Sequence, residues 1–449
     1  MRRLIPVAAA GGIVLFLLCG SAVADVPHPL TLTQAVTLAL KGNGELRSMK
    51  EEKGIIQAQH LTAMALPNPL LELEGSSGAT FGSGEDYGVS VGISQEFVTA
   101  GKRAKRRAVN DRSLEAYLWR LVDRERLLTE EVTVAYHELQ FCEKRRKLAE
   151  TALDLSNQLF AVATQRFTAG DIPELELNLA QVEVVRSEGG ILAAEQELLP
   201  ARTRLAELLG AEGQVKVEGE QMREELLSPS LPLSGLLEGL PQRRPDLLAL
   251  AAERERGHAE EESAKVERIP NVTASLFYRH DEMSFQIDRQ QGLKRDDTLG
   301  LRFSIPLPLL DQNQGRIGEA KARTSRSNRE LESAMAVTRR EVTTAHGRLQ
   351  GSIKLLTLYS RQILPQLEEN LRLTREAYQL GEVGILSVIQ EQRKFLELRD
   401  GQLTELKNGF IAQARLKAAA GISTDVGAYG HTPRADSRPP LPITTGGAL

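Results

Sequence analysis

The sequence predicts a mainly α-helical protein with a small β part, built from two copies of one unit. Three observations lead to this fold class. The stretch from Lys102 to Ala169 lacks both glycine and proline. Short segments of two-residue apolar and polar alternation occur in both halves, and similar motifs recur 211 residues apart. Each copy is therefore expected to contain a helix, a β-hairpin, a long helix and a further helix.

The N-terminus has the features of a secretory signal peptide. Basic Met1-Arg2-Arg3 precedes an apolar run that ends in the small-residue cleavage motif Ala22-Val23-Ala24. We expect residues 1–24 to be removed. Acylation of Cys19 is the alternative, and it is disfavoured because Leu18, rather than a small residue, precedes the cysteine.

The composition argues against several classes of protein. The signal holds two of the 56 basic residues and none of the 60 acidic ones, which leaves a mature net charge of about −6 and suggests no nucleic-acid partner. Cys142 would be the only remaining cysteine, so no intramolecular disulfide can form. No later apolar run reaches the roughly 18 residues that an inner-membrane helix needs.

The long helix predicted over 102–169 would extend about 100 Å at 1.5 Å per residue. Globular helices usually end near 20 residues, so this length indicates a coiled coil or a similar rod. Apolar residues support that interpretation because they alternate at spacings of four and three. They are Leu128, Val132, Ala135, Leu139 and Cys142, and, after a slip in phase, Leu148, Ala152, Leu155, Leu159 and Val162. We interpret Cys142 as a buried packing residue.

The repeat divides the chain. Gly170 pairs with Gly381, and Arg204-Leu-Ala-Glu-Leu-Leu-Gly210 pairs with Arg415-Leu-Lys-Ala-Ala-Ala-Gly421. We predict a first unit at 25–210, a linker at 211–234, a second unit at 235–422 and a flexible tail at 423–449. The hairpins are expected at about 70–97 and 271–305, and the long helices at about 102–169 and 316–380. A kink is expected at Pro365, and bends are expected at Gly101 and Gly315.

The alternating segments read as strands that could cross a membrane. Tyr87, Val89, Val91 and Ile93 alternate with small or polar residues, as do Leu299, Leu301, Phe303 and Ile305. About ten residues of such alternation suit a transmembrane β-strand, although a half-buried soluble strand fits the periodicity almost as well. The polar stretches 75–86 and 279–296 are expected to be loops. Four strands cannot close a barrel, so membrane insertion would require several chains.

Several motifs, taken in order, resemble the outer membrane efflux protein family of TolC-type channels, in particular its heavy-metal cation branch of CzcC-like components. They are Pro67-Asn-Pro-Leu, Ser94-Gln-Glu-Phe before Gly101-Lys-Arg, Arg243-Arg-Pro-Asp-Leu247, Ile305-Pro-Leu-Pro-Leu-Leu-Asp and Tyr378-Gln-Leu-Gly381. The resemblance covers about residues 32–422. It implies a homotrimer with a twelve-stranded β-barrel in the outer membrane, continued by a long periplasmic α-helical barrel.

The resemblance also implies partners and sites. A periplasmic adaptor (membrane fusion protein) and an inner-membrane pump of the RND type would dock at the helix turns farthest from the barrel. These tip residues are Phe167, Gly170, Asp171, Tyr378, Gly381 and Glu382. Acidic residues that narrow the pore in some members match Ser387 and Gln390 here, neither of them acidic, whereas the first unit offers Glu176. A solvated helix face is the alternative for Glu176.

No enzyme or cofactor is expected. The seven histidines lack paired ligand spacing, and the chain shows no nucleophile constellation. His280-Asp-Glu-Met283 is expected to be a polar loop rather than a metal site. The basic run Lys102–Arg107 is read as a solvated helix start, with anionic lipid contact as the alternative.

The function indicated is a passive exit duct of a tripartite efflux system, with heavy-metal cations as the first substrate class. Drugs or other small solutes, and a type I secretion channel, are alternatives with the same fold. A soluble periplasmic coiled-coil adaptor or scaffold is the alternative from another class.

Overall fold

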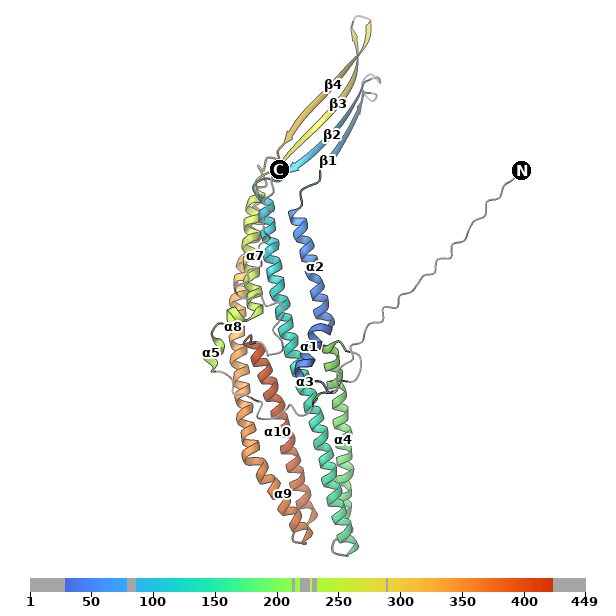
Figure 1. The fold of residues 1–449 in the computed structure, drawn as a ribbon, viewed down its shortest axis with the longest axis vertical. Coiled ribbons are helices and arrows are strands. Elements are labelled where there is room, and N and C mark those ends of the chain that lie inside the picture. The colour runs from blue at the N-terminus through green and yellow to red at the C-terminus, as the bar shows by residue number, and fades with distance from the viewer. Residues whose placement is uncertain are drawn as a thin grey trace, which may run out of the picture.

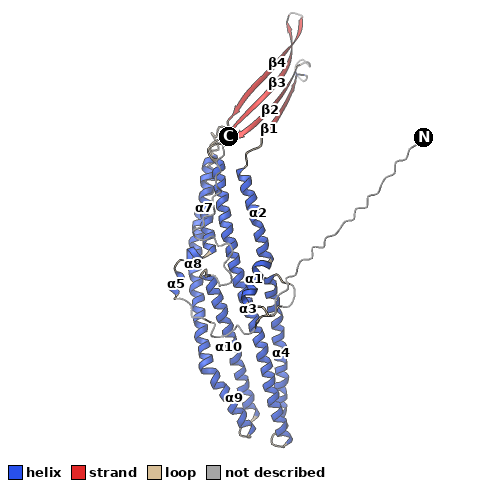
Figure 2. Ribbon diagram, in the orientation of Figure 1, coloured by secondary structure: helices blue, strands red, loops and turns tan. Residues whose placement is uncertain are grey.

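The computed structural model describes residues 29–78, 86–211, 215–218, 227, 232–287 and 290–422. The predicted signal peptide with Cys19, the predicted tail and part of the predicted linker lie outside these residues. The described chain is an elongated rod, with a β-sheet at one end and two helical turns at the other (Figure 1). Helices make up the rest of its length (Figure 2).

The elements of the first half follow the predicted order. They are α1 (Leu32–Gly42), α2 (Gly44–Met64), β1 (Leu70–Ser77), β2 (Tyr87–Phe97), α3 (Lys102–Thr168) and α4 (Glu174–Leu209). Helix α3 has 67 residues without interruption, which corresponds to about 100 Å. Without proline, the stretch has no residue that lacks a backbone N–H or clashes with the carbonyl one turn earlier, and without glycine it avoids the largest loss of backbone entropy on helix formation.

The second half repeats the arrangement with extra short helices. Its elements are α5 (Leu233–Leu237), α6 (Leu240–Arg243), α7 (Pro245–Glu267), β3 (Val272–Ile287), β4 (Gln290–Ser304), α8 (Gln314–Leu358), the π-helical turn η3 (Tyr359–Ile363), α9 (Leu364–Gln379) and α10 (Ile385–Ala419). The predicted interruption at Pro365 occurs as this π-helical turn. Proline offers no N–H and its ring displaces the carbonyl one turn earlier, so the preceding turn widens.

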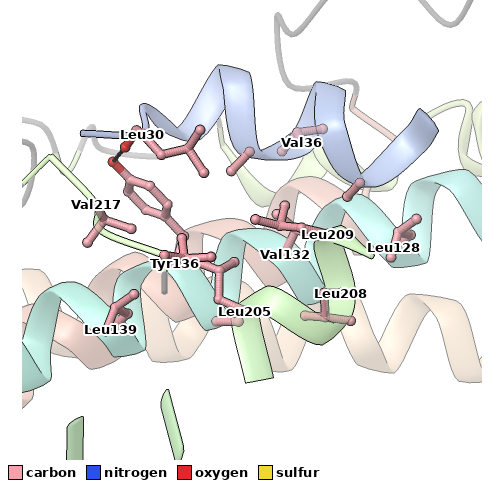
Figure 3. Packing of buried hydrophobic residues seen from close by; sticks show 14 of the residues in the cluster. Leu30, Val36, Leu128, Val132, Tyr136, Leu139, Leu205, Leu208, Leu209 and Val217 are labelled. Carbon is pink, nitrogen blue, oxygen red and sulfur yellow. Dashed lines mark hydrogen bonds between the residues drawn. The ribbon is translucent and has the colours of Figure 1, made fainter. Parts of the chain in front are cut away.

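An apolar cluster holds the N-terminal segment to the middle of the rod. The predicted core positions Leu128, Val132, Ala135 and Leu139 are all buried, in one cluster with residues of α1 and α4. Figure 3 shows Val36 of α1 and Leu205 of α4 in this cluster. The Tyr136 hydroxyl donates a hydrogen bond to the Leu30 carbonyl at 3.0 Å. Leu30 in turn forms a parallel β-bridge with Val217 of the linker. The prediction of a buried Cys142 was only partly right, because its thiol is half-buried at the border of two clusters.

The four strands form one antiparallel sheet in the order β1-β2-β3-β4. Its register places apolar residues in rows across all four strands. One row is Leu73, Val91, Tyr278 and Leu299, and the next is Leu71, Ile93, Leu276 and Leu301. These eight side chains are 44% to 74% exposed. Over these two rows, one face of the sheet is therefore apolar and uncovered in the single chain. The next row on the same face contains His280 and Asp297, so the face becomes polar toward the tip of the β3–β4 hairpin.

Small residues on the other face make room for an aromatic ring. A Cβ atom at Gly300 would lie 2.4 Å from the Phe277 ring, and one at Gly92 would lie 3.1 Å from the Phe277 Cβ. The Arg302 guanidinium lies over the same ring, 5.0 Å from its centroid. The glycines of the alternating pattern are thus required by packing on the polar face.

Two local predictions were wrong. The stretch 279–296 is not a loop, since β3 and β4 continue through most of it. The strands remain paired there because polar partners face each other, among them His280 and Asp297 at 2.6 Å. Residues 75–77, also predicted as loop, belong to β1, and 79–85 lie outside the described residues.

The second correction concerns the bend after β4. Gly101 has the expected positive φ of 66°, but Gly315 is helical. Asn313 takes the left-handed conformation instead, with φ 61°, and its side-chain amide donates to the Ala264 carbonyl at 2.8 Å. Asparagine tolerates this region better than other non-glycine residues, so the bend lies two residues earlier than predicted.

Candidate functional site at the helical tips

Two turns with the same backbone geometry form the end of the rod opposite the sheet. Gly170 and Gly381 both have φ 82°. In the first turn the Asp171 N–H donates to the Arg166 carbonyl at 2.9 Å, and in the second the Glu382 N–H donates to the Ala377 carbonyl at 2.8 Å. This is the Schellman pattern, which ends a helix and satisfies its last carbonyls. The assignment of Gly170, Asp171, Gly381 and Glu382 to the tip that docks the adaptor and pump stays a prediction, because the backbone geometry of the turns does not show what binds there.

The two turns differ in their aromatic residues. Phe167 is partly exposed on the first turn, whereas its repeat counterpart Tyr378 is 1% exposed. Arg166 donates to the Tyr378 carbonyl at 2.7 Å, and its guanidinium carbon lies 4.9 Å from the Tyr378 ring centroid. The second turn is therefore held against the first within one chain. Burial raises the pKa of the Tyr378 phenol, and the nearby Glu176 carboxylate adds to the rise.

The aperture candidates occupy different environments. Ser387 and Gln390 are exposed on α10. Glu176 is half-buried between the two turns, where its Oε1 lies 4.0 Å from the Cβ position of Gly384. Its carboxylate is thus directed at the second turn of its own chain. The exposed carboxylates of the tip are those of Asp171, Glu174 and Glu382. Which of these residues line an aperture remains a prediction.

Above the turns, polar contacts connect α3 and α4 to α10. Glu183 and Arg393 form an ion pair, and Gln392 Nε2 donates to Ser156 Oγ at 3.2 Å. An apolar cluster that includes Leu159, Ala180 and Val388 fills the space between the helices. The two helical hairpins of one chain are therefore packed together over their lower part. Sequence reasoning did not find these contacts because they join residues 210 and 236 positions apart.

The basic run at the start of α3 is structural in this chain. Lys102 is 3% exposed, and its ammonium donates to Asn271 Oδ1 at 2.7 Å. Arg103 donates to the Met64 carbonyl at 2.6 Å, and Arg106 pairs with Glu267 at 2.7 Å. These cations are thus engaged within the strand-to-helix junction, which leaves fewer charges for contact with anionic lipid.

The described residues contain no cluster of three or more His, Cys, Asp or Glu side chains arranged to hold a metal ion. His280, singled out in the sequence, lies in β3 and is bonded to Asp297. Among the described helices, none has the length and hydropathy of a membrane-crossing segment.

A buried joint carries the motif Arg243-Arg-Pro-Asp-Leu247. Arg244 is 4% exposed, pairs with Asp246 at 2.8 Å and donates to the Ala419 carbonyl at 2.9 Å. Pro245 is the first residue of α7, as predicted from its lack of an N–H. Burial opposes ionisation of Asp246, but the bonded guanidinium outweighs it and holds the pKa of that carboxyl below its usual range. Arg244 thus joins the end of α10 to the start of α7.

A sequence profile described as outer membrane efflux protein matches residues 35–211 and again 236–422. The chain belongs to the outer membrane efflux protein family. Two characterised family relatives are 24% identical to it. The cobalt-zinc-cadmium resistance protein CzcC of Cupriavidus metallidurans aligns over 84% of this chain and 86% of its own length. The pyoverdine export outer membrane protein OpmQ of Pseudomonas aeruginosa aligns over 80% and 74%.

Solved structures of membrane channel proteins share the fold. The channel protein CusC matches with a TM-score of 0.72 at 20% identity, over 87% of this chain and 92% of that one. The outer-membrane channel OprN gives the same TM-score and identity over 87% and 90%. The MtrE channel of Neisseria gonorrhoeae matches with a TM-score of 0.69 at 18% identity, over 88% and 91%. The predicted fold class, mainly helical with a small sheet, is confirmed.

Proposed function

We propose that three copies of this chain assemble into the exit duct of a tripartite efflux system, with the sheet in the bacterial outer membrane and the helices in the periplasm. The duct is passive and performs no catalysis. The observation that carries the proposal is the four-stranded sheet, with one apolar exposed face and two unpaired edges, at the end of a rod about 100 Å long.

In a membrane, the two edge strands of the sheet must pair with further strands. Strands β1 and β4 are the outer strands of the described sheet, so each presents backbone N–H and C=O groups on one side. Each of these groups would cost several kcal/mol if it faced lipid without a hydrogen-bond partner. Pairing β1 of one copy with β4 of the next satisfies both edges, and three copies supply twelve strands. The apolar rows would then face the lipid.

The helical layer also has two complementary edges. Helix α4 presents Leu175, Val182, Val185, Leu192 and Leu199, which are 60% to 68% exposed. They follow the heptad spacing of a second coiled-coil seam, distinct from the face that packs on α3. At the other edge, the exposed leucines are Leu358 of α8, Leu373 of α9 and Leu380 in the turn after α9. If the α4 edge of one copy packs on the α8 and α9 edge of the next, the copies form a closed ring when the rotation between neighbours is one third of a full turn.

The two turns would be the docking end for a periplasmic adaptor and an RND-type pump. Their exposed carboxylates Asp171, Glu174 and Glu382 give that end a negative surface, which would attract a partner with basic side chains at its own tip. Channel opening would require the hairpins of one chain to separate, and Arg166 to release the Tyr378 carbonyl.

For the exported solute we propose heavy-metal cations, on the likeness to a cobalt-zinc-cadmium resistance protein. Export of small organic solutes is the second candidate, on the similar likeness to a pyoverdine export protein. A strain lacking the chain should become sensitive to zinc, cobalt or cadmium and regain resistance with the wild-type gene. Sensitivity to dyes or antibiotics alone would favour the second candidate.

Membrane fractionation tests the assembly. The mature chain should appear in the outer-membrane fraction as a heat-labile trimer. Recovery in the soluble periplasmic fraction would instead support a coiled-coil adaptor or scaffold and would overturn the proposed duct.

A further inference from the structure

An apolar segment lies directly after β4, where the sheet passes into the helical rod (Figure 1). This leucine segment, residues 305–310, reads Ile-Pro-Leu-Pro-Leu-Leu. Leu307, Leu309 and Leu310 are 74%, 77% and 92% exposed in the single chain. A contiguous exposed apolar patch usually marks a surface that contacts a membrane or another protein. The exposure of the leucine segment therefore calls for a covering partner.

The connection from strand to helix does not require these leucines. In the first unit, the four residues 98–101 join β2 to α3. The Thr99 hydroxyl donates a hydrogen bond to the Pro270 carbonyl at 2.6 Å, which ties this connection to the second unit. In the second unit, the nine residues 305–313 join β4 to α8. Chain connectivity alone therefore does not explain the longer, leucine-rich connection.

The apolar band of the sheet runs obliquely across the strands. On β2 its residues extend from Tyr87 to Phe97, apart from Gln95. The residue of β4 level with Tyr87 is Arg295, and the band on β4 begins only at Leu299. Strands of membrane barrels tilt by roughly 35–45°, so the membrane plane crosses the rows obliquely. A strand whose apolar band begins nearer the periplasm therefore also ends nearer the periplasm.

The height of the band places its periplasmic end on the leucine segment. The ten residue steps from Tyr87 to Phe97 cover about 34 Å along the strand, or about 26 Å in height at a tilt of about 40°. Outer-membrane barrels have an apolar band about 25 Å tall. The same ten steps from Leu299 end at Leu309, although β4 itself ends at Ser304. An extended continuation of β4 thus supplies the second half of its band.

The leucine segment continues the side of the sheet that would face lipid. Side chains of an extended chain alternate between two sides, so Ile305 and Leu307 fall on the same side as Leu301 and Phe303. Leu301, Phe303 and Ile305 are 72%, 68% and 50% exposed. In the proposed ring a neighbouring copy meets the edge of the sheet, not this side.

The backbone of the leucine segment suits apolar surroundings. An N–H group without a hydrogen-bond partner is costly away from water. Pro306 and Pro308 have no N–H, and the Leu309 N–H donates to the Leu307 carbonyl at 2.9 Å. Half of the six residues therefore present no free backbone donor. Charged and polar residues resume at Asp311.

We propose that residues 305–310 are embedded in the periplasmic leaflet of the outer membrane, with Leu307, Leu309 and Leu310 among the acyl chains of its phospholipids. Three copies then place nine leucines around the base of the barrel. They set the depth at which the membrane ends and the helical duct begins. This proposal rests on the proposed duct and concerns how its membrane part is held.

Tryptophan fluorescence tests the surroundings of the segment. The single tryptophan of the chain, Trp119 on α3, is first replaced by phenylalanine. Leu309→Trp is then the reporter, and Leu380→Trp, at a site 76% exposed at the opposite end of the rod, is the matched control. The full mature chain is reconstituted in vesicles of phosphatidylethanolamine and phosphatidylglycerol, part of which carries bromine on its acyl chains. Bromine quenches tryptophan only at close range.

Brominated lipid should reduce the emission of Leu309→Trp at least two-fold and leave that of Leu380→Trp unchanged. Bromine near the headgroup should quench more strongly than bromine near the chain end, because the segment lies at the rim of the membrane. Leu310→Trp, at the 92% exposed site, should give the same pattern and is a second reporter.

Flotation with the vesicles and a heat-labile trimer on a gel show that each variant has inserted and assembled. Inserted trimers in which bromine does not quench either reporter would overturn this proposal and leave the duct intact. Blue-shifted, unquenched emission would then place the segment against the neighbouring copy. A position in lipid accepts a tryptophan, so failure of both reporters to assemble would also contradict the proposal. A wild-type chain that does not float with the vesicles would overturn the proposed function itself.

Discussion

Acidification should destabilise the fold through one buried histidine. His137 on α3 is 6% exposed, stacks on Phe410 with ring centroids 4.6 Å apart, and has Nδ1 3.0 Å from Gln140 Oε1. Burial lowers the pKa of His137 to about 4, against 6.5 for an exposed imidazole. The unfolded chain therefore takes up a proton near pH 6.5, whereas the folded chain does so only near pH 4.

The magnitude follows from that gap. A difference of about 2.5 pKa units corresponds to about 3 kcal/mol at 1.36 kcal/mol per unit. The contribution of neutral His137 is fully present above pH 6.5, decreases as the pH falls from 6.5 to 4, and is constant below. Between pH 7 and pH 4.5 the loss should reach about 2 to 3 kcal/mol per chain.

Guanidinium unfolding of the detergent-solubilised protein at several pH values measures this. His137→Gln cannot be protonated, so its stability should fall less between pH 7 and pH 4.5 by that amount. The same substitution at His258, exposed on α7, should leave the wild-type pH dependence unchanged. If His137→Gln and the wild type lose stability in parallel, the imidazole is not the group responsible and the reasoning is refuted.

Two further predictions concern the joint and the tip. Arg244→Met should cost about 2 to 4 kcal/mol because it leaves the half-buried Asp246 carboxylate and the Ala419 carbonyl without their donor. Arg254→Met, at an exposed pair, should cost at most about 1 kcal/mol, and equal unfolding midpoints of the two variants in guanidinium would contradict this. Gly170→Ala should weaken the first turn by about 1 to 2 kcal/mol because of its positive φ. Gly54→Ala, inside α2 with open space around it, should stabilise by about 0.5 to 1 kcal/mol. Amide exchange rates that change in the same direction in both variants would show that the turn geometry is not limiting.

The parts of the fold that depend on local chemistry could be predicted from the sequence. The 67-residue helix α3 follows from a stretch without helix breakers. The apolar rows of the sheet follow from strict alternation, because side chains of a strand point to opposite faces in turn. Pro245 begins α7, where a backbone N–H has no carbonyl to pair with, and Pro365 lies in the first turn of α9, directly after the π-helical turn.

The failures occurred where partners distant in sequence decide the outcome. Residues 279–296 look like a loop on their own, yet pairs such as Glu282 with Arg295 keep the strands together. Burial of Tyr378 but not of Phe167 depends on Arg166 of the other unit.

Counting the chains in the assembled particle tests the central claim most directly. Native mass spectrometry of the protein extracted in detergent from outer membranes should show a particle of three copies, since only shared strands can satisfy the free edges of β1 and β4. A monomeric particle, folded and stable in the absence of detergent, would contradict the account.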